Sequence, residues 1–335
     1  VSIVNVGEPN MLKRWQTSLL AQIVGSFSVL SLVIVALVAY VAFNQARSSL
    51  KASVEERLTA SATLKELELN RWLLDRRNLL LALHSLPTVQ TQAAILLTAA
   101  TDTPEQQSAQ AALQNTLGAV AGDRTDYREL FILSRSGRVL MSTRPEHRGR
   151  YLSLVQSSAI DPDHDASSFT ANFYRSTETD QPAVTFTVPI TAASGEQLGF
   201  FVADLNLNRL DEIMRDNRNL GQTGESYLVA DLGSSFAHRY AFVSAQGFGS
   251  TEFPEGIASP GIIAAIDGND GTGLYQNYRG VPVIGIYRWL EQQDVAFLVE
   301  LEQSEAFAPA RQLATTILVT GIGLATILMV GIVLL

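Results

Sequence analysis

Apolar and polar positions divide this chain into three parts. Residues 19–43 and 315–335 are apolar runs without a single charged side chain, whereas the sequence between them has the mixed pattern of soluble domains. A helix needs about 20 apolar residues to cross the hydrocarbon core of a bilayer. The pattern therefore predicts two transmembrane helices with one large folded region between them.

The stretch 44–85 contains neither Gly nor Pro and is rich in Leu, Glu, Lys and Arg, which favour helix. It predicts a long helix that continues from the first span. Its leucines recur at mixed spacings of 3, 4 and 6, which is too irregular for a strict coiled-coil seam. We therefore expect this helix to pack partly on its own domain and partly on a second subunit.

After residue 122 the periodicity becomes that of strands. In one half we expect strands at 130–133, 138–141, 169–174, 183–189 and 198–205, then a helix at 207–214. In the other half, after a turn at 221–224, we expect strands at 227–230, 273–278, 281–290 and 295–301. This order repeats, which predicts two consecutive modules, each a small antiparallel sheet with helices. The predicted fold class is α/β (α+β).

The predicted elements divide the chain into a leader (1–18), a first span (19–43), a helical segment (44–121), two modules (122–218 and 219–311) and a second span (315–335). Lys13 and Arg14 precede the first span, and basic flanks usually stay in the cytoplasm, so the modules are expected outside it. The first span exceeds the 7–15 apolar residues of a signal peptide, which favours an uncleaved anchor. Because the chain begins at Val1 and ends inside an apolar run, we expect a fragment that lacks a cytoplasmic output domain.

Net charge and cysteine content limit the classes of partner and metal site that the chain can have. The chain has 24 Lys and Arg against 33 Asp and Glu, a net charge of -9, so we expect no nucleic-acid partner. The absence of cysteine excludes disulfides and thiolate metal sites. The run 161–165 (DPDHD) resembles the start of a calcium loop, but Ala166 and Asn172 stand where an EF-hand needs Gly and Glu. No metal and no cofactor is expected.

Enzyme signatures are incomplete. Residues 48–51 match S-x-x-K, but no K-T-G follows, and residues 268–273 (GNDGTG) lack the Lys of a phosphate-binding loop. No G-x-S-x-G occurs. We therefore predict that this segment is not an enzyme.

Several motifs resemble a known family. Residues 220–232 (LGQTGESYLVADL), 271–290 (GTGLYQNYRGVPVIGIYRWL) and 296–300 (AFLVE) resemble the membrane-proximal module of the double Cache (dCache) sensor domain. Residues 132–142, 182–189 and 199–210 are similar to its membrane-distal, ligand-binding module. The resemblance covers residues 44–310.

The resemblance implies a long helix followed by two PAS-like modules, anchored as a homodimer in the inner membrane of a bacterium. It also implies the extracytoplasmic, ligand-sensing region of a signal-transduction receptor: a histidine kinase, a chemoreceptor, a nucleotide cyclase or a diguanylate cyclase. Whether the full-length protein is an enzyme through its output domain stays open. We expect ligand binding in the distal module to be passed through the long helix and the proximal module to the second span.

The chain departs from the family members that bind amino acids. Those members resemble one another in an Arg-x-Trp-Tyr element, in a Tyr and an Asp after a strand that ends in Pro, and in an Asp on the last strand. Only the last has a counterpart here, Asp204. This departure favours a small molecule other than an amino acid.

The candidate ligand-binding residues lie on three predicted strands and one loop of the distal module: Tyr174 and Arg175, Thr185 and Thr187, Asp204, and Arg148 and Arg150. Thr185 and Thr187 share one face because strand side chains alternate. A carboxylate in an apolar strand needs a cation, so Asp204 binds a ligand amine or a neighbouring Arg, or it caps the helix near residue 207. The two arginines either bind an acidic metabolite or are solvated.

Two alternatives remain open at this point. Aromatic residues of the proximal module line a second pocket or, as is commoner for strand aromatics, form its core: Tyr227, Tyr275, Tyr278, Tyr287 and Trp289. The folded region recognises a small molecule or, alternatively, a protein partner; a membrane-tethered enzyme is the third possibility.

Overall fold

A computed structural model describes residues 19–123, 127–151, 171–175, 182–231, 240–242 and 256–334. Contacts divide the chain into two compact units. The central unit comprises Glu55–Glu302, and the terminal unit comprises Val1–Val54 together with Gln303–Leu335.

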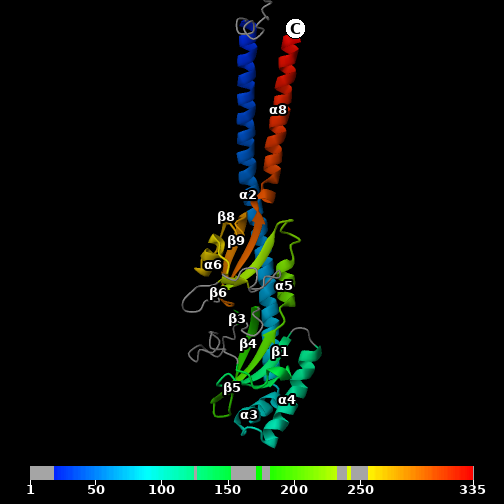
Figure 1. The fold of residues 1–335 in the computed structure, drawn as a ribbon, viewed down its shortest axis with the longest axis vertical. Helices are drawn as coiled ribbons and strands as arrows, with labels where there is room; N and C mark the ends of the chain where they lie inside the picture. The colour runs from blue at the N-terminus through cyan, green and yellow to red at the C-terminus, as the bar shows by residue number, and fades with distance from the viewer. Residues whose placement is uncertain are drawn as a thin grey trace, which may run out of the picture. The chain divides into compact units, whose positions relative to one another are not determined.

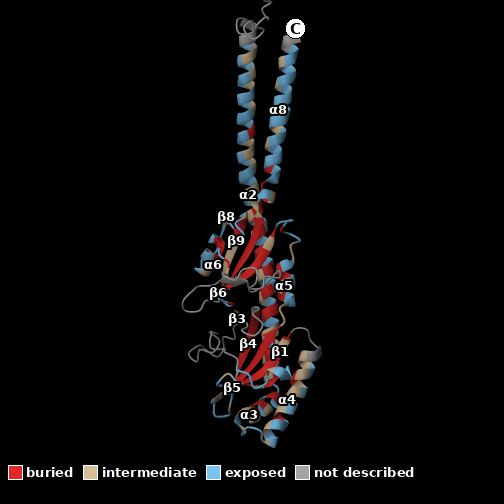
Figure 2. Cartoon of the chain, viewed as in Figure 1, coloured by how far each residue is buried: buried red, intermediate tan, exposed pale blue. Residues whose placement is uncertain are grey.

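The described residues of the terminal unit are almost all helical. Its two main helices are α2 (Leu19–His84), which continues into the central unit, and α8 (Ala308–Leu334), which follows the short α7 (Gln303–Ala306). The apolar side chains of the two predicted spans within these helices are largely exposed, as the pale blue ribbon there in Figure 2 shows; Phe27 is 66% exposed and Leu328 65%. Among the described residues, these two helices are long and apolar enough to cross a membrane. The predicted spans are thus exposed apolar helices.

The first predicted span and the long helix after it form one continuous helix, α2 (Figure 1). It ends at His84 because Leu86 precedes Pro87 and is held in an extended conformation (φ -62°, ψ 125°). Pro87 then opens α3 (Pro87–Thr98), and Pro104 opens α4 (Pro104–Asp123). The predicted long N-terminal helix is confirmed, and two shorter helices follow it before the first sheet.

The first sheet is antiparallel and has the strand order β2-β1-β5-β4-β3. Its strands are β1 (Tyr127–Ser134), β2 (Val139–Ser142), β3 (Asn172–Arg175), β4 (Pro182–Thr191) and β5 (Gln197–Leu205). The 3-10 helix η1 (Pro145–His147) follows β2, and α5 (Asn208–Arg215) follows β5. Gly137, at φ 79°, makes the β1–β2 turn that the sequence predicts.

The second sheet repeats this topology with the order β7-β6-β10-β9-β8. Its strands are β6 (Glu225–Asp231), β7 (Tyr240–Phe242), β8 (Gly271–Gln276), β9 (Pro282–Leu290) and β10 (Val295–Glu302). Helix α6 (Pro260–Ile266) contacts β8, β9 and β10. In each sheet the first and fifth strands lie side by side at the centre, so the predicted α/β architecture of two antiparallel modules is confirmed.

Within the central unit, α2 contacts both modules. His84 stacks on Phe201 of the first sheet, with ring centroids 6.4 Å apart. Glu66 forms an ion pair with Arg288 of the second sheet at 2.6 Å. Buried Lys65 donates hydrogen bonds to the carbonyls of Ile213 and Met214, which fixes the end of α5 to α2. This helix is therefore a common support for both modules.

Sequence patterns did not predict two elements of the second module, β7 and α6. β7 has only three residues, and α6 is a seven-residue apolar segment without helical periodicity. Ser259 caps α6 by accepting a hydrogen bond from the Ile262 N–H, and Pro260 occupies its first turn. The strand predicted at 169–174 begins at Asn172 in the structure; residues 169 and 170 lie outside the described residues.

Candidate functional site

Buried polar side chains form a row across the first sheet. Glu129 on β1 is the register partner of Asp204 on β5, and Asp204 is the register partner of Thr185 on β4. Directly paired residues project from the same face of a sheet. We call Glu129, Asp204 and Thr185 the first polar row; their exposed fractions are 4%, 9% and 0%.

The face that carries this row is mostly apolar. Neighbouring register positions on β1, β2 and β5 form one buried cluster of Phe131, Leu133, Val139, Phe200 and Val202. Phe201, which stacks on His84 of α2, alternates with these residues and so projects from the opposite face. The row therefore interrupts an apolar wall on the face away from α2, which is the composition of a small-molecule site.

A β-bulge brings a cation to Asp204. The register of β1 against β5 shifts between Tyr127 and Glu129, which leaves Arg128 as the extra residue. The Arg128 guanidinium lies 3.7 Å from Asp204 Oδ2. The predicted neighbouring Arg is therefore present, and α5 begins without a side-chain cap from Asp204.

The second carboxylate of the row is held by its own neighbours. Ser142 donates a hydrogen bond to Glu129 Oε1, and His147 Nδ1 lies 2.8 Å from Glu129 Oε2. Both Glu129 oxygens are thus engaged. Glu129 is therefore a carboxylate already occupied by its neighbours rather than a free ligand-binding group.

Two atoms of the row have no hydrogen-bond partner among the described residues. They are Asp204 Oδ1 and Thr185 Oγ1, which belong to residues paired in register on adjacent strands. Burial raises the pKa of Asp204 from 3.8 to about 6; Arg128 opposes this shift and Glu129 adds to it. An unpaired buried acceptor costs about 1–3 kcal/mol, so this pair is poised to receive a hydrogen-bond donor.

The structure brings together some of the predicted site residues. Thr187 lies on the same face as Thr185, at the register position of Val202, and is 8% exposed. Arg148 and Arg150 follow η1 in an exposed loop, and His147 at the end of η1 reaches the row. The backbone of Tyr174 and Arg175 pairs with β4, whereas their side chains lie outside the described residues, as does the run 161–165.

Sequence reasoning missed Glu129, Ser142 and His147 as members of this site. Glu129 sits in an apolar strand as Asp204 does, and that shared context was the available signal. The contacts of Ser142 and His147 with Glu129 span 13 and 18 residues along the chain, so local patterns could not reveal them.

The tyrosines of the second module lie around two further carboxylates. The hydroxyls of Tyr227 and Tyr275 each donate to Glu300 Oε1 at 2.9 Å, and the Tyr278 hydroxyl lies 3.3 Å from Glu225 Oε2. Tyr227 belongs to a buried apolar cluster against which Tyr278, Tyr287 and Trp289 also pack. The prediction that these aromatics form core is consistent with this packing.

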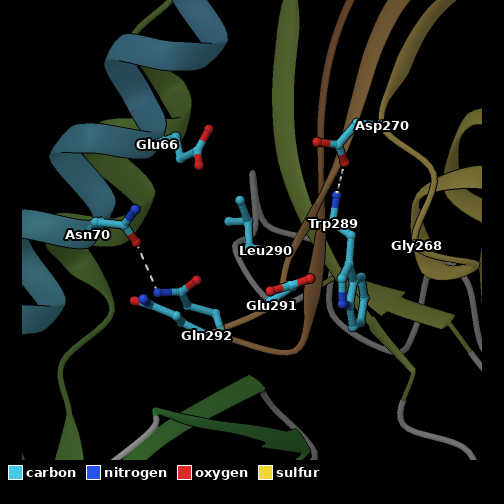
Figure 3. A pocket seen from close by; sticks show the side chains of 9 residues that line it. Glu66, Asn70, Gly268, Asp270, Trp289, Leu290, Glu291 and Gln292 are labelled. Carbon is cyan, nitrogen blue, oxygen red and sulfur yellow. Dashed lines mark hydrogen bonds between the residues drawn. The ribbon is translucent and has the colours of Figure 1, made fainter.

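An open groove of about 520 Å³ lies between α2 and the β9–β10 turn (Figure 3). Gln293 donates to Asn70 Oδ1 at 2.9 Å, and Asp270 Oδ1 accepts from the Trp289 N–H at 2.8 Å, as the dashed lines show. Asn70, Gln293 and Asp270 are thus engaged by groups of the groove itself. Residues 291–294 form the turn between β9 and β10. Among the described residues, no cluster of three or more His, Asp or Glu is arranged to hold a metal.

Comparison with known proteins gives a family match. The family model of the Cache domain, dCache_1, matches residues 41–310, which is most of the chain. No curated protein matches significantly.

Similar folds occur among solved structures of bacterial sensors. The periplasmic domain of RsbU from Chlamydia trachomatis is 15% identical, with a TM-score of 0.47 over 78% of this chain and 96% of that one. The sensor domain of the histidine kinase DctB from V. cholerae is 12% identical (TM-score 0.47; 73% and 98% covered). The ligand-binding domain of the Campylobacter jejuni chemoreceptor Tlp3, in complex with 4-methylisoleucine, is 11% identical (TM-score 0.45; 78% and 94% covered).

Proposed function

Because the chain belongs to the Cache domain family, we propose that it is the ligand-sensing region of a transmembrane receptor and binds a small molecule at the first polar row. A Cache domain between two exposed apolar helices suggests a membrane protein with an extracytoplasmic domain. Both helices cross the inner membrane in this proposal, and a cytoplasmic output domain receives the signal. The Cache segment itself senses and does not catalyse.

One observation carries the position of the site. Asp204 Oδ1 and Thr185 Oγ1, on residues paired in register, are both buried without a partner among the described residues, on a largely apolar face turned away from the supporting helix. Native structures leave few buried polar atoms unsatisfied, and those few call for an explanation. A bound ligand that donates hydrogen bonds to both atoms would explain why they have no partner within the protein.

The charges of the row favour a cationic ligand. Two carboxylates, Glu129 and Asp204, lie in register, and Glu129 is already engaged by Ser142 and His147. The Arg128 guanidinium lies 3.7 Å from Asp204 Oδ2 and so only partly neutralises the Asp204 carboxylate. A ligand ammonium donates to Asp204 Oδ1 and gains from both negative charges. We therefore propose an amine-bearing small molecule that need not be an amino acid.

The signal in this proposal follows the covalent chain. Glu302, the last residue of β10, is followed directly by α7 and α8, so a shift of the second sheet acts on the second span. A ligand shifts an equilibrium between two states only through its different affinity for them. The first sheet must therefore close on the ligand differently in the resting and signalling states, and α2, which contacts both modules, links them.

A thermal-shift screen of the full chain in detergent micelles tests this function. The library contains amines, polyamines, amino acids, organic acids, purines and sugars. A ligand at 100 times its Kd stabilises the folded state by about 2.7 kcal/mol, so we expect a melting temperature several degrees higher with an amine. If no compound of the library raised the melting temperature of a cooperatively unfolding sample, the small-molecule site would be rejected and a protein partner favoured.

The exposed face of α2 supports a homodimer. Three large leucines project from the central unit, Leu64 (62% exposed), Leu67 (61%) and Leu74 (46%). With Arg71 and Asn78 they follow the alternating spacing of 3 and 4 residues that two supercoiled helices use. Two copies anchored in one membrane have parallel α2 helices. We propose that a second copy of this chain covers this stripe.

A further inference from the structure

The two modules correspond position by position around their central strands. In the first sheet the register row reads Asn172, Thr185, Asp204 and Glu129 from β3 to β1. In the second sheet the row with the same strand order reads Gly273, Gly285, Glu300 and Glu225 from β8 to β6. Glu300 thus occupies the place of Asp204, and Gly285 the place of Thr185.

The missing side chain at Gly285 makes room for Tyr275. A Cβ on Gly285 would lie 2.0 Å from the Tyr275 hydroxyl oxygen, and a Cβ on Gly261 of α6 would lie 2.5 Å from it. The hydroxyl therefore lies between β9 and α6, and from there it donates to Glu300 Oε1. Tyr227 donates to the same oxygen from β6. In the first module Asp204 Oδ1 has no partner among the described residues, whereas in the second module two tyrosine hydroxyls bind Glu300 Oε1.

The Glu300 carboxyl is fully buried, and its second oxygen, Oε2, has no hydrogen-bond partner among the described residues. Titratable and polar groups surround it from several elements. They are Glu225 and Tyr227 on β6, Tyr275 on β8, Asn277, Tyr278 and Arg279 in the β8–β9 turn, Tyr287 on β9 and Glu302 on β10. Helix α6 contributes no titratable residue. Arg279, the cation of this set, acts on Glu225 and stacks on Tyr278. No cation is thus engaged with Glu300 itself in the described contacts.

We propose that this cluster is a second binding site of the protein, at which the ligand is a proton held by Glu300 within the cage of Tyr227 and Tyr275. The site gives the sensor an input of its own in the second module, three residues before α7 begins. It does not depend on the amine site: the titration below keeps its meaning whether or not the ligand screen finds a compound.

The electrostatics support a change of state near neutral pH. Burial raises the pKa of Glu300 from 4.5 to about 7; the hydrogen bonds from the tyrosines oppose this shift, and Glu225 adds to it. Because the folded-state value lies above the unfolded one, the contribution of Glu300 to stability is complete below about pH 4.5 and is lost as the pH rises through about 7. The second module is therefore expected to loosen in mild alkali.

Infrared titration of the carboxyl C=O band, on the full chain in detergent micelles between pH 5 and 9, tests the proposal. Two protonated carboxyl bands are expected, one from Asp204 with a midpoint near 6 and one from Glu300 with a midpoint near 7. We expect the band with the midpoint near 7 to be absent from Glu300→Gln and to persist in Asp204→Asn. Tyr275→Phe keeps the ring and removes one hydrogen bond to the ionised form, so it moves the midpoint upward. A midpoint below 5.5, or the same band in Glu300→Gln, overturns the proposal, as does an unmoved midpoint in Tyr275→Phe.

A matched glycine pair tests the tyrosine cage independently. Gly285→Ala forces Tyr275 off Glu300, whereas an added Cβ at its register partner Gly273 finds its nearest atom at 3.6 Å, an ordinary contact. We expect a melting temperature several degrees lower for Gly285→Ala and little changed for Gly273→Ala. Equal melting temperatures would show that Tyr275 does not occupy the site, and the proposal would fall.

Discussion

Replacing Asp204 with Asn is expected to weaken binding of the amine ligand by on the order of 100-fold. The change keeps the shape of the side chain and removes the charge that the ammonium group pairs with. Losing one partner of a buried, hydrogen-bonded charge pair costs about 2–5 kcal/mol, and each 1.4 kcal/mol is a factor of about ten in Kd. Isothermal titration of the full chain with a ligand from the screen measures the loss.

The stability of this variant separates lost binding from unfolding. Since burial raises the pKa of Asp204 to about 6, its charge opposes folding at neutral pH, and Asp204→Asn should melt at or above the wild-type temperature. Asp267→Asn, the same change at an exposed position of the second module, should leave affinity unchanged. Equal affinity in wild type and Asp204→Asn would remove Asp204 from the site.

The same carboxyl makes binding depend on pH. Below about pH 6 Asp204 takes up a proton, and a cationic ligand then loses its partner. Affinity should fall by up to about tenfold for each pH unit below that value and be flat above pH 7. Asp204→Asn should abolish this slope.

Cysteines placed on the exposed stripe of α2 are expected to cross-link two copies of the chain. The natural sequence has no cysteine, so Leu67→Cys or Leu74→Cys introduces the sole thiol. Like positions face each other across the two-fold axis of a parallel helix pair, so oxidation in micelles should convert most of the protein to a disulfide-linked dimer. Non-reducing gel electrophoresis measures the fraction.

Two further variants control this result. Ala111→Cys, exposed on α4, should remain largely monomeric under the same oxidation. Leu67→Glu combined with Leu74→Cys places like charges at the stripe and should suppress the cross-link. Equal cross-linking of Ala111→Cys and Leu67→Cys would show that the disulfides form by random encounters between molecules and that the α2 stripe is not a dimer interface.

The sequence predicted the fold because its signals were local. An uncharged apolar run, a long stretch without Gly or Pro, and alternating apolar positions each specify one element without knowledge of its neighbours. Resemblance to the Cache family then ordered the modules. β7 and α6 were missed because they are too short to show a period, and their structure depends on packing against β6 and β9.

The leucine spacing of α2 looked irregular because two apolar stripes overlap in the sequence. Leu58, Leu69, Leu73 and Leu80 are buried against the modules, whereas Leu64, Leu67 and Leu74 are exposed. Only the burial of each leucine separates the two sets. Neither stripe can be recognised until the domain that covers one of them is known.

The site was predictable only in part for a similar reason. Asp204 and Thr185 stood out because polar residues in apolar strands need an explanation. The bulge that turns Arg128 toward Asp204, and the contacts that occupy Glu129, depend on strand register. The correspondence of Glu300 with Asp204 also required both sheets, since the two rows share few residue types.

Hydrogen–deuterium exchange of the full chain, with and without an amine from the screen, tests most directly that the ligand binds at the first polar row. We predict the largest slowing of exchange in peptides from β1, β4 and β5, which carry Glu129, Thr185 and Asp204. Smaller changes in the second sheet would fit transmission of the signal. Slowing confined to the second sheet, with β1, β4 and β5 unchanged, would contradict the account.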